Sequence, residues 1–331
     1  MLPGLTCHPL SPADVPDWWA LLDRAAAVDA PHVRDSPEWL RRSLTGEGFD
    51  PAVQTVAGRD ETGVLRAAGL VELRMGDRAH LRLPFDGVVD PAWRGRGVGR
   101  ALLAWGQRAA AVRAAARRRE LGTGPGEEVG ADVQVWAEEH RDDVARLCAR
   151  AGFEVRRWFS TMRRTLPAGA GIEAPPPPAG HRVVRFDEHD GRGLRELHNA
   201  VFADHWGSQP LTAADWSRYV VDNPEFRPGW SRLVLAGDEP VAYATVFAHE
   251  SDWPALGFAQ ADLGNLGVRR DHRGRGLAGI LLGAVARAAR EAGMAAVSLD
   301  VDSENPSGAV GLYERAGYVR VHGTVLRARP V

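Results

Sequence analysis

The tetrapeptide Arg-Gly-Arg-Gly occurs twice in this chain of 331 residues, at 94–97 and at 273–276. Each copy follows a run of β-forming residues and precedes an amphipathic segment typical of a helix. A strand, a glycine-rich turn and a helix N-terminus together bind phosphate groups, because unpaired backbone N–H groups and the helix dipole point at the anion. The repeat therefore predicts two copies of one anion-binding unit.

The stretches around the two turns also match each other. The expected elements of the first half are strands at 53–57, 65–75 and 81–89, a helix at 98–119, a strand at 132–136, a helix that ends at Gly152 and a strand at 153–163. Those of the second half are strands at 231–236, 241–249 and 258–268, a helix at 277–292, a strand at 295–301, a helix that ends at Gly317 and a strand at 318–327. Capped helix starts are expected at 35–39 and 212–216. Each half is thus predicted to be an α+β domain.

A proline-rich segment divides the chain near its middle. Residues 167–180 contain four consecutive prolines at 175–178, which favour a stiff extended spacer and enter neither helix nor sheet. We therefore expect a first domain at 1–166, a linker at 167–180 and a second domain at 181–331.

Composition narrows the possible partners and the compartment. The formal net charge is -2, so no overall basic field attracts nucleic acid, and all 41 cationic residues are Arg, which excludes lysine Schiff-base chemistry. Cys7 and Cys148 lie far apart, as expected for a reducing compartment. No apolar run approaches the roughly 18 residues of a membrane helix, and the N-terminus does not look like a signal peptide. A cytoplasmic protein without membrane or nucleic-acid partners is predicted.

These features resemble the GNAT superfamily of N-acetyltransferases, in the two-domain arrangement of the mycothiol-synthase type. The first family signature reads Arg94-x-x-Gly97-x-Gly99 and Arg273-x-x-Gly276-x-Ala278. The second, an Asn, an Ala, Leu-Tyr and a Gly-aromatic pair, is found only in the second half, as Asn305, Ala309, Leu312-Tyr313 and Gly317-Tyr318. The resemblance implies an α/β (α+β) fold of two tandem GNAT domains. Each would have a mixed, mostly antiparallel sheet flanked by helices.

The resemblance also implies acetyl-CoA as co-substrate and an amine as acceptor. The backbone of the strand before the turn would bind the pantetheine, and the turn amides would bind the pyrophosphate, with arginines neutralising its charge. The residues expected to bind acetyl-CoA in the second half are Leu266, Gly267, Val268, Arg273, Gly274, Arg275, Gly276, Leu277, Ala278 and Asn305. Their counterparts in the first half are Val88, Val89, Arg94, Gly95, Arg96, Gly97, Val98 and Gly99. Gly264 and Gly267 interrupt an apolar strand, which marks a bulge or a close ligand approach.

Two residues of the second half are candidates for the proton transfers. Tyr313 stands where the family places the tyrosine that protonates the departing thiolate; the alternative is a core ring with an exposed hydroxyl. Asp262 is the carboxylate closest to the position of the glutamate base of mycothiol synthases; the alternative is a strand-edge carboxylate in solvent. Glu250 and Asp252 are reserve candidates. His249-Glu250 is not followed by a second His at the HExxH spacing, so no metal is expected.

The first half lacks these groups. Matching Gly152 with Gly317 puts Cys148 at the position of Tyr313, and matching Arg94 with Arg273 puts Leu83 at that of Asp262. We therefore expect a degenerate first domain, which either still binds acetyl-CoA or serves only as scaffold, and a catalytic second domain.

The acceptor is expected to be a small-molecule amine. Aromatic candidates for its pocket, each with core packing as the alternative, are Phe202, His205, Trp206, Trp216 and Tyr219. Other functions that the sequence leaves open are a non-catalytic acyl-CoA sensor or scaffold and a protein N-acetyltransferase. The chain is expected to be a monomer with an internal pseudo-dimer, or a homodimer.

Overall fold

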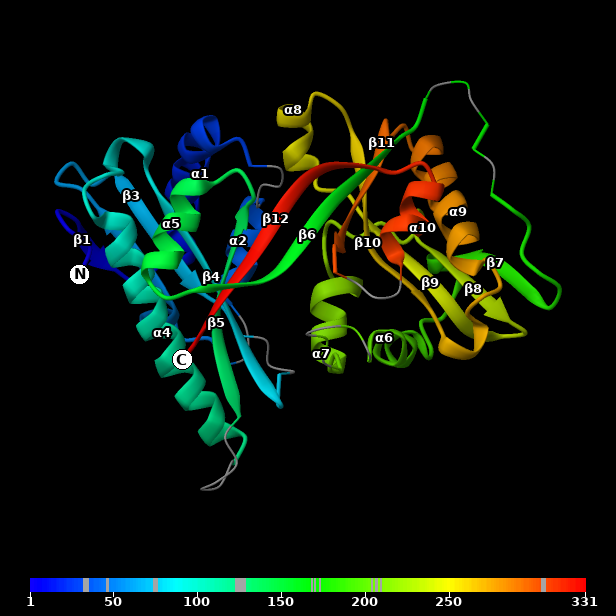
Figure 1. The fold of residues 1–331 in the computed structure, drawn as a ribbon, viewed down its shortest axis with the longest axis horizontal. Coiled ribbons are helices and arrows are strands. Elements are labelled where there is room, and N and C mark those ends of the chain that lie inside the picture. Colours follow the sequence, from blue (N-terminus) through cyan, green and yellow to red (C-terminus); the bar gives the residue numbers. More distant parts are fainter. Residues whose placement is uncertain are drawn as a thin grey trace. The chain divides into compact units, whose positions relative to one another are not determined.

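The computed structural model describes residues 1–331 except 32–35, 46–47, 74–76, 123–128, 168, 170, 173, 204, 206–207, 209 and 305–307. The chain forms two compact units (Figure 1). Unit 1 consists of Met1–Trp158 together with Gly323–Val331, and unit 2 consists of Phe159–His322. Neither unit is therefore one uninterrupted half of the sequence.

Unit 1 combines a sheet with helices on both of its faces. Its elements are β1 (Thr6–His8), α1 (Val15–Asp29), α2 (Pro37–Ser43), α3 (Pro51–Gln54), β2 (Thr55–Arg59), β3 (Leu65–Val71), β4 (His80–Val89), α4 (Val98–Glu120), β5 (Gly130–Glu138) and α5 (Asp142–Arg150). The next strand, β6 (Glu154–Thr165), carries the chain into unit 2.

Unit 2 repeats this order of strands. It contains β7 (His181–Arg185), α6 (Leu194–Phe202), α7 (Ala213–Trp216), β8 (Arg232–Ala236), β9 (Glu239–Phe247), α8 (Trp253–Leu256), β10 (Gln260–Val268), α9 (Leu277–Glu291), β11 (Ala296–Asp302) and α10 (Ala309–Arg315). Its short helix α8 lies between β9 and β10, whereas α3 of unit 1 precedes β2. The final strand, β12 (Val319–Pro330), returns the chain to unit 1.

The two units exchange their last strands. The strand order is β1-β2-β3-β4-β5-β12 in unit 1 and β7-β8-β9-β10-β11-β6 in unit 2. In unit 1, β12 pairs with β5 from Thr324↔Glu138 to Pro330↔Asp132, and in unit 2, β6 pairs with β11 from Thr165↔Ala296 to Phe159↔Asp302. Each half of the sequence therefore completes the sheet of the other half.

The predicted fold class is confirmed, because both sheets are mixed and mostly antiparallel. Among the described residues, only the pairs β4–β5 and β10–β11 are parallel. The strand expected at 53–57 is partly wrong: Asp50 caps a helical turn by accepting a hydrogen bond from the backbone N–H of Ala52, and Pro51 stands at its first position. The ring of a proline at that position holds its φ near the helical value, which favours the helical turn. Residues 51–54 therefore form α3, and β2 begins only at Thr55.

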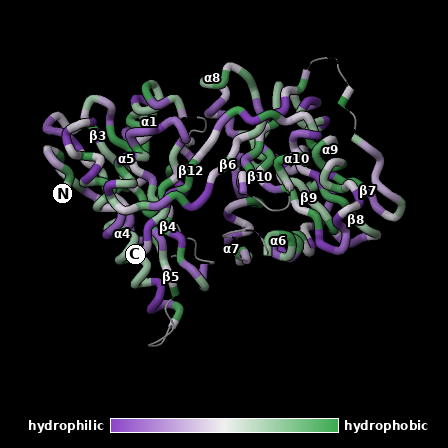
Figure 2. The backbone as a smooth tube through the Cα atoms, in the orientation of Figure 1, coloured by the Kyte–Doolittle hydropathy of each residue, from purple (hydrophilic) through white to green (hydrophobic). Residues whose placement is uncertain are grey.

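A hydrophobic core lies on each face of both sheets. In unit 1, α4 and α5 cover one face, while α1 and α2 cover the other. In unit 2, α9 and α10 cover one face and α6 and α7 the other. The hydropathy colouring of Figure 2 shows hydrophobic residues gathered along α9 and β9, which agrees with their burial.

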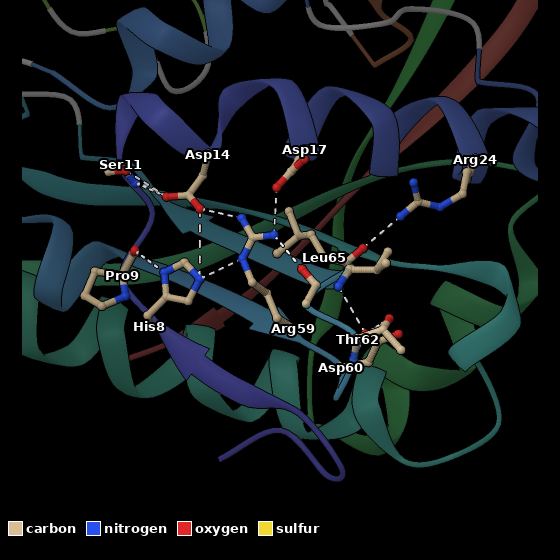
Figure 3. Close-up of polar contacts among 12 residues, drawn as sticks. His8, Pro9, Ser11, Asp14, Asp17, Arg24, Arg59, Asp60, Thr62 and Leu65 are labelled. Carbon is tan, nitrogen blue, oxygen red and sulfur yellow. Dashed lines mark hydrogen bonds and ion pairs between the residues drawn. The ribbon is translucent and has the colours of Figure 1, made fainter.

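Ion pairs fix the first helix of unit 1 to its sheet. Arg59 on β2 donates to the carboxylates of Asp14 and Asp17, both at 2.7 Å, and to Nε2 of His8 at 3.2 Å (Figure 3). Burial would raise the pKa of Asp14, but hydrogen bonds from Arg59 and Ser11 outweigh it and lower that pKa. The start of α1 is thereby tied to β1 and β2.

Candidate active site

The second glycine turn has the geometry that its sequence predicts. Gly274 and Gly276 have φ of +76° and +75°, a region that strains other residues, and a Cβ added to either would meet nothing within 4 Å. Gly276 is the N-cap of α9, so the first N–H groups of that helix lack intrahelical partners. Arg273 donates from Nε to the carbonyl of Val268 at 3.1 Å, and its side chain otherwise lies exposed. The turn therefore leaves open space beside its backbone, with exposed arginine side chains next to it.

The first glycine turn has the same backbone but different side-chain contacts. Gly95 and Gly97 have φ of +76° and +82°, and Arg94 donates from Nε to the carbonyl of Val89 at 3.2 Å. Both terminal nitrogens of Arg94 also bind the carboxylate of Asp29, each at 2.7 Å. A bidentate pair of this kind is strong and geometrically fixed, so the charge of Arg94 is neutralised within the protein.

In both units the strand before the turn separates from its parallel neighbour. β10 pairs with β11 only from Gln260 to Asp262, although the strands continue to Val268 and Asp302. β4 likewise pairs with β5 only from His80 to Pro84. Beyond these points the strand before the turn keeps hydrogen-bonded pairing on one side alone, so its backbone on the other side can bind a ligand.

Glycines in β10 accommodate protein side chains. The register between β10 and β9 shifts at Gly264, which confirms a bulge. A Cβ at Gly264 would lie 2.4 Å from the ring of Phe247, and one at Gly267 would lie 2.5 Å from the side chain of Val201. The close approach that the sequence indicated is therefore made by side chains of unit 2 at both positions.

Asp262 lies at the last pair before the strands separate. Its half-buried carboxylate accepts hydrogen bonds at Oδ1 from Nε2 of Gln260, at 3.0 Å, and from Oγ of Ser298. No hydrogen bond to Oδ2 is formed by the described residues. Burial raises the pKa of Asp262 above its ordinary value, although the charge of His249 and the two hydrogen bonds act in the opposite direction. A raised pKa makes a carboxylate a better base near neutral pH.

His249 follows β9 and supplies a positive charge near Asp262. Its Nδ1 lies 2.9 Å from the carboxylate of Glu225, and its ring stacks on Phe247 with centroids 6.5 Å apart. Burial would lower the pKa of His249, but the hydrogen bond to Glu225 and the charges of Asp262, Glu225 and Asp252 raise it to about 9. The imidazole is therefore protonated at neutral pH.

Tyr313 lies on α10 and packs against the α9 side of the core. Its ring contacts Tyr318 edge to face with centroids 5.9 Å apart, and no described residue forms a hydrogen bond with its hydroxyl. Burial raises the pKa of Tyr313 to about 12, so the hydroxyl holds its proton throughout the physiological range. The hydroxyl of Tyr318, which is 1% exposed, is likewise without a partner in the described part of the chain.

The other predicted residues are spread over unit 2. Asn305 and Trp206 lie outside the described residues. Glu250 forms an ion pair with Arg227 at 2.8 Å, and Asp252 is buried. The acceptor candidates Phe202 and Trp216 pack in the core around the buried His198–Tyr243 hydrogen bond, and His205 contacts the ring of Phe202. Tyr219 lies beside Arg218.

Sequence reasoning missed the residues that hold Asp262. Gln260, Ser298 and Arg163 come from three different strands, and none belongs to a recognisable motif. One signal was present: polar residues alternate with apolar ones along Ser298-x-Asp300-x-Asp302, which is typical of a strand with one polar face.

Comparison with known proteins identifies the family. Residues 192–318 match the acetyltransferase (GNAT) family. The chain is 31% identical over 278 residues to a mycothiol acetyltransferase of Clavibacter michiganensis, with 84% of this chain and 80% of the relative covered. It is 32% identical over 313 residues to a mycothiol acetyltransferase of Frankia alni, with 91% and 88% covered. The chain belongs to the GNAT family of acetyltransferases. It is therefore an acyltransferase whose co-substrate is acetyl-CoA.

Solved structures show the same tandem arrangement. A GCN5-related N-acetyltransferase from Sphaerobacter thermophilus matches with a TM-score of 0.73 and 26% identity, covering 100% of this chain and 97% of that one. A tandem GNAT protein from the clavulanic acid biosynthesis pathway matches with a TM-score of 0.65 and 18% identity, covering 98% of both chains. The predicted tandem GNAT architecture is confirmed. Among the described helices, none is both long and apolar enough to cross a membrane.

Proposed function

We propose that this acetyltransferase transfers the acetyl group of acetyl-CoA to a primary amine of a small molecule, with the chemistry in the C-terminal half. The observation that carries the proposal is the point where β10 leaves β11. There the C-terminal half places the carboxylate of Asp262, with one oxygen free of hydrogen bonds from the described residues. The corresponding last pair of the N-terminal half contains Pro84, which has no ionisable group.

Acetyl-CoA supplies the thioester-bound acetyl group when it is bound. The amides of residues 274–278 would hold its pyrophosphate, with Arg273 and Arg275 neutralising the charge. The β10 backbone at Leu266, Gly267 and Val268 would hold the pantetheine, since β11 does not pair with it there. The open turn and the unpaired strand edge support this placement.

Asp262 and Tyr313 would move the protons. The acceptor amine arrives as an ammonium ion, and Oδ2 of Asp262 takes one proton from it to leave a nucleophilic nitrogen. This nitrogen attacks the acetyl carbon directly, so a C–N bond forms and the C–S bond breaks. Tyr313 donates its proton to the sulfur of the departing thiolate, and the new amide nitrogen releases its second proton to the solvent. The solvent then returns a proton to Tyr313 and takes the proton held by Asp262. The raised pKa of each group keeps the base effective near neutral pH and the acid protonated.

The N-terminal half would serve as a degenerate partner. Cys148 replaces Tyr313 and is buried, with 1% of its surface exposed. Burial raises the pKa of the Cys148 thiol, although the charge of Arg327 acts in the opposite direction. Such a thiol has no access to a ligand and behaves as a small apolar core residue.

A turnover assay tests the proposed function. Conversion of acetyl-CoA to CoA is measured by chromatography against amines of four classes: mycothiol-type amines, aminoglycosides, polyamines and peptides with a free N-terminus. We expect the highest kcat/KM with a small-molecule amine, and the names of the relatives make the first class the first to try. Turnover of peptides alone would instead support a protein N-acetyltransferase.

A further inference from the structure

Asp262 belongs to a row of polar residues that runs across three adjacent strands of unit 2. Asp262 on β10 pairs with Ser298 on β11, and Ser298 pairs with Arg163 on β6. Residues paired in this way project their side chains to the same face of a sheet. The alternating neighbours Met162 and Val297 lie in the core on the α9 face, so the row lies on the opposite face.

Hydrogen bonds connect the ends of this row through Gln260. Arg163 donates from Nε to Oε1 of Gln260 at 2.8 Å. Nε2 of Gln260 donates to Oδ1 of Asp262 at 3.0 Å and to Oγ of Ser298 at 2.9 Å. A guanidinium group can only donate, so it requires the amide oxygen of Gln260 on its side and the amide NH₂ on the carboxylate side. Arg163 thus determines which end of Gln260 faces Asp262.

The buried surroundings of Arg163 strengthen its hydrogen bond to Gln260. Gln260 and Ser298 are each 4% exposed, so little water competes for their hydrogen bonds. The guanidinium lies 5.1 Å from the ring centre of Phe258 and forms no ion pair with a carboxylate of the described residues. Burial lowers the pKa of Arg163, and the negative charge of Asp262 acts in the opposite direction. The guanidinium of Arg163 therefore interacts mainly with Gln260 and with the charge of Asp262.

We propose that Arg163, on the strand that the N-terminal half contributes to unit 2, is a positioning residue for the carboxylate of Asp262 and acts through Gln260. The inference rests on the proposed role of Asp262 as base. It means that the N-terminal half of the sequence completes the active site of the C-terminal half. With Oδ1 of Asp262 held by Gln260 and Ser298, Oδ2 is left to meet the acceptor amine.

Substitution of Arg163 in the full chain tests the proposal. In Arg163→Met, Gln260 loses the donor that orients it, and kcat should fall about tenfold, a part of what a general base contributes. The acid limb of the kcat/KM profile should move to higher pH, since loss of a nearby positive charge raises the pKa of a carboxylate. The KM for acetyl-CoA should not change. Arg163→Lys should recover most of kcat, because a single N–H donor suffices here.

The pH profile must be interpreted with the other charged groups near Asp262. His249, after β9, carries a positive charge that lowers the pKa of Asp262, and Asp300 on β11 raises it. Glu225 and Asp252 act on His249 in turn. None of these groups is altered in the Arg163 variants, so the difference between two profiles reports the effect of Arg163.

A double substitution tests whether Gln260 mediates the effect. Arg163→Met combined with Gln260→Leu should lower kcat no further than the more damaging single substitution, because both remove the same connection. Arg182→Met is the matched control, since Arg182 lies exposed on β7 of the same sheet and pairs with the exposed Asp238. Additive losses, or a lower melting temperature for Arg163→Met with an unchanged kcat and pH profile, would overturn the proposal. Acetyl-CoA binding by calorimetry verifies that each variant is folded.

The outcome with Asp262→Asn separates this inference from the proposed function. If Asp262→Asn keeps its full kcat/KM, the assignment of the base fails and the positioning role falls with it. If Asp262→Asn is inactive while Arg163→Met retains normal kcat and an unshifted profile, only the inference on Arg163 fails.

Discussion

The strand–turn–helix segments β4–α4 and β10–α9 share a backbone but differ in the row of residues where their strands separate. Counting the bulge at Gly264, Asp262 corresponds to Pro84, and not to Leu83 as simple counting from the turn predicts. The row in unit 2 is Asp262, Ser298 and Arg163, whereas that in unit 1 is Pro84, Gln134 and Ala328. Duplication has thus kept the turn and the strand separation, while ionisable groups remain in one copy only.

The glycine turns at 94–97 and 273–276 also differ in the contacts of their first arginine. Arg94 is bound by Asp29 within unit 1, whereas Arg273 is exposed and, among the described residues, donates only to the backbone carbonyl of Val268. A glycine turn by itself therefore does not define a phosphate site. We propose that the arginine of the second turn is available to a ligand, whereas that of the first turn stabilises the fold.

The largest effect is expected at the position where the two rows differ most. Asp262→Asn removes the base and should lower kcat/KM by roughly 10² to 10⁴-fold. Pro84→Ala, at the equivalent position of the N-terminal half, should leave turnover unchanged. Both are measured by the conversion of acetyl-CoA to CoA at saturating acetyl-CoA. Equal losses in the two variants would contradict the assignment of chemistry to the C-terminal half.

Tyr313→Phe should have the next largest effect. Without its hydroxyl the thiolate must take a proton from water, and kcat should fall roughly 10²-fold, within the range of general-acid contributions. Acetyl-CoA affinity should be retained, because the phosphate turn is intact. Cys148→Ser is the matched change in the N-terminal half, and its kcat should equal that of the parent protein. A normal kcat in Tyr313→Phe would exclude this tyrosine as the acid.

The arginines of the two turns should separate binding from stability. Arg273→Gln removes a cation from an open turn and should weaken acetyl-CoA binding about tenfold by calorimetry, with the free energy of unfolding unchanged. Arg94→Gln breaks the bidentate contact with Asp29 and should lower the free energy of unfolding by roughly 1–3 kcal/mol in urea. Loss of acetyl-CoA affinity in Arg94→Gln would show instead that the first turn also binds the co-substrate.

The last difference concerns the pH dependence of stability. The pKa of His249 rises from 6.5 to about 9 on folding, so its contribution is complete below pH 6.5 and is lost as the pH rises through 9. The difference in the free energy of unfolding between the parent protein and His249→Gln should shrink over this interval, by on the order of 2 kcal/mol. The measurement is urea titration of both proteins at pH 6, 7.5 and 9.5. A constant difference for His249→Gln would contradict the coupling to Glu225.

Local patterns predicted most elements and the central turn. Glycines at positive φ, capping residues such as Ser36 and Thr212, and apolar periodicity act within a few residues, so the sequence displays them directly. The edge strands β1 and β7 were missed because they are short and carry little hydrophobic pattern. The surroundings of Asp262 were missed because Gln260, Ser298 and Arg163 meet only through strand register.

The sequence by itself determined the duplication, the two glycine turns and the family signatures, because each depends on neighbouring residues. Tertiary structure alone decided that β6 completes the C-terminal sheet and β12 the N-terminal one. The two final strands have similar patterns and face similar sheet edges, so no local signal specifies which partner each one takes. That choice brings Arg163 to Gln260, which holds the carboxylate of Asp262, and thereby joins two halves that the sequence presents as separate.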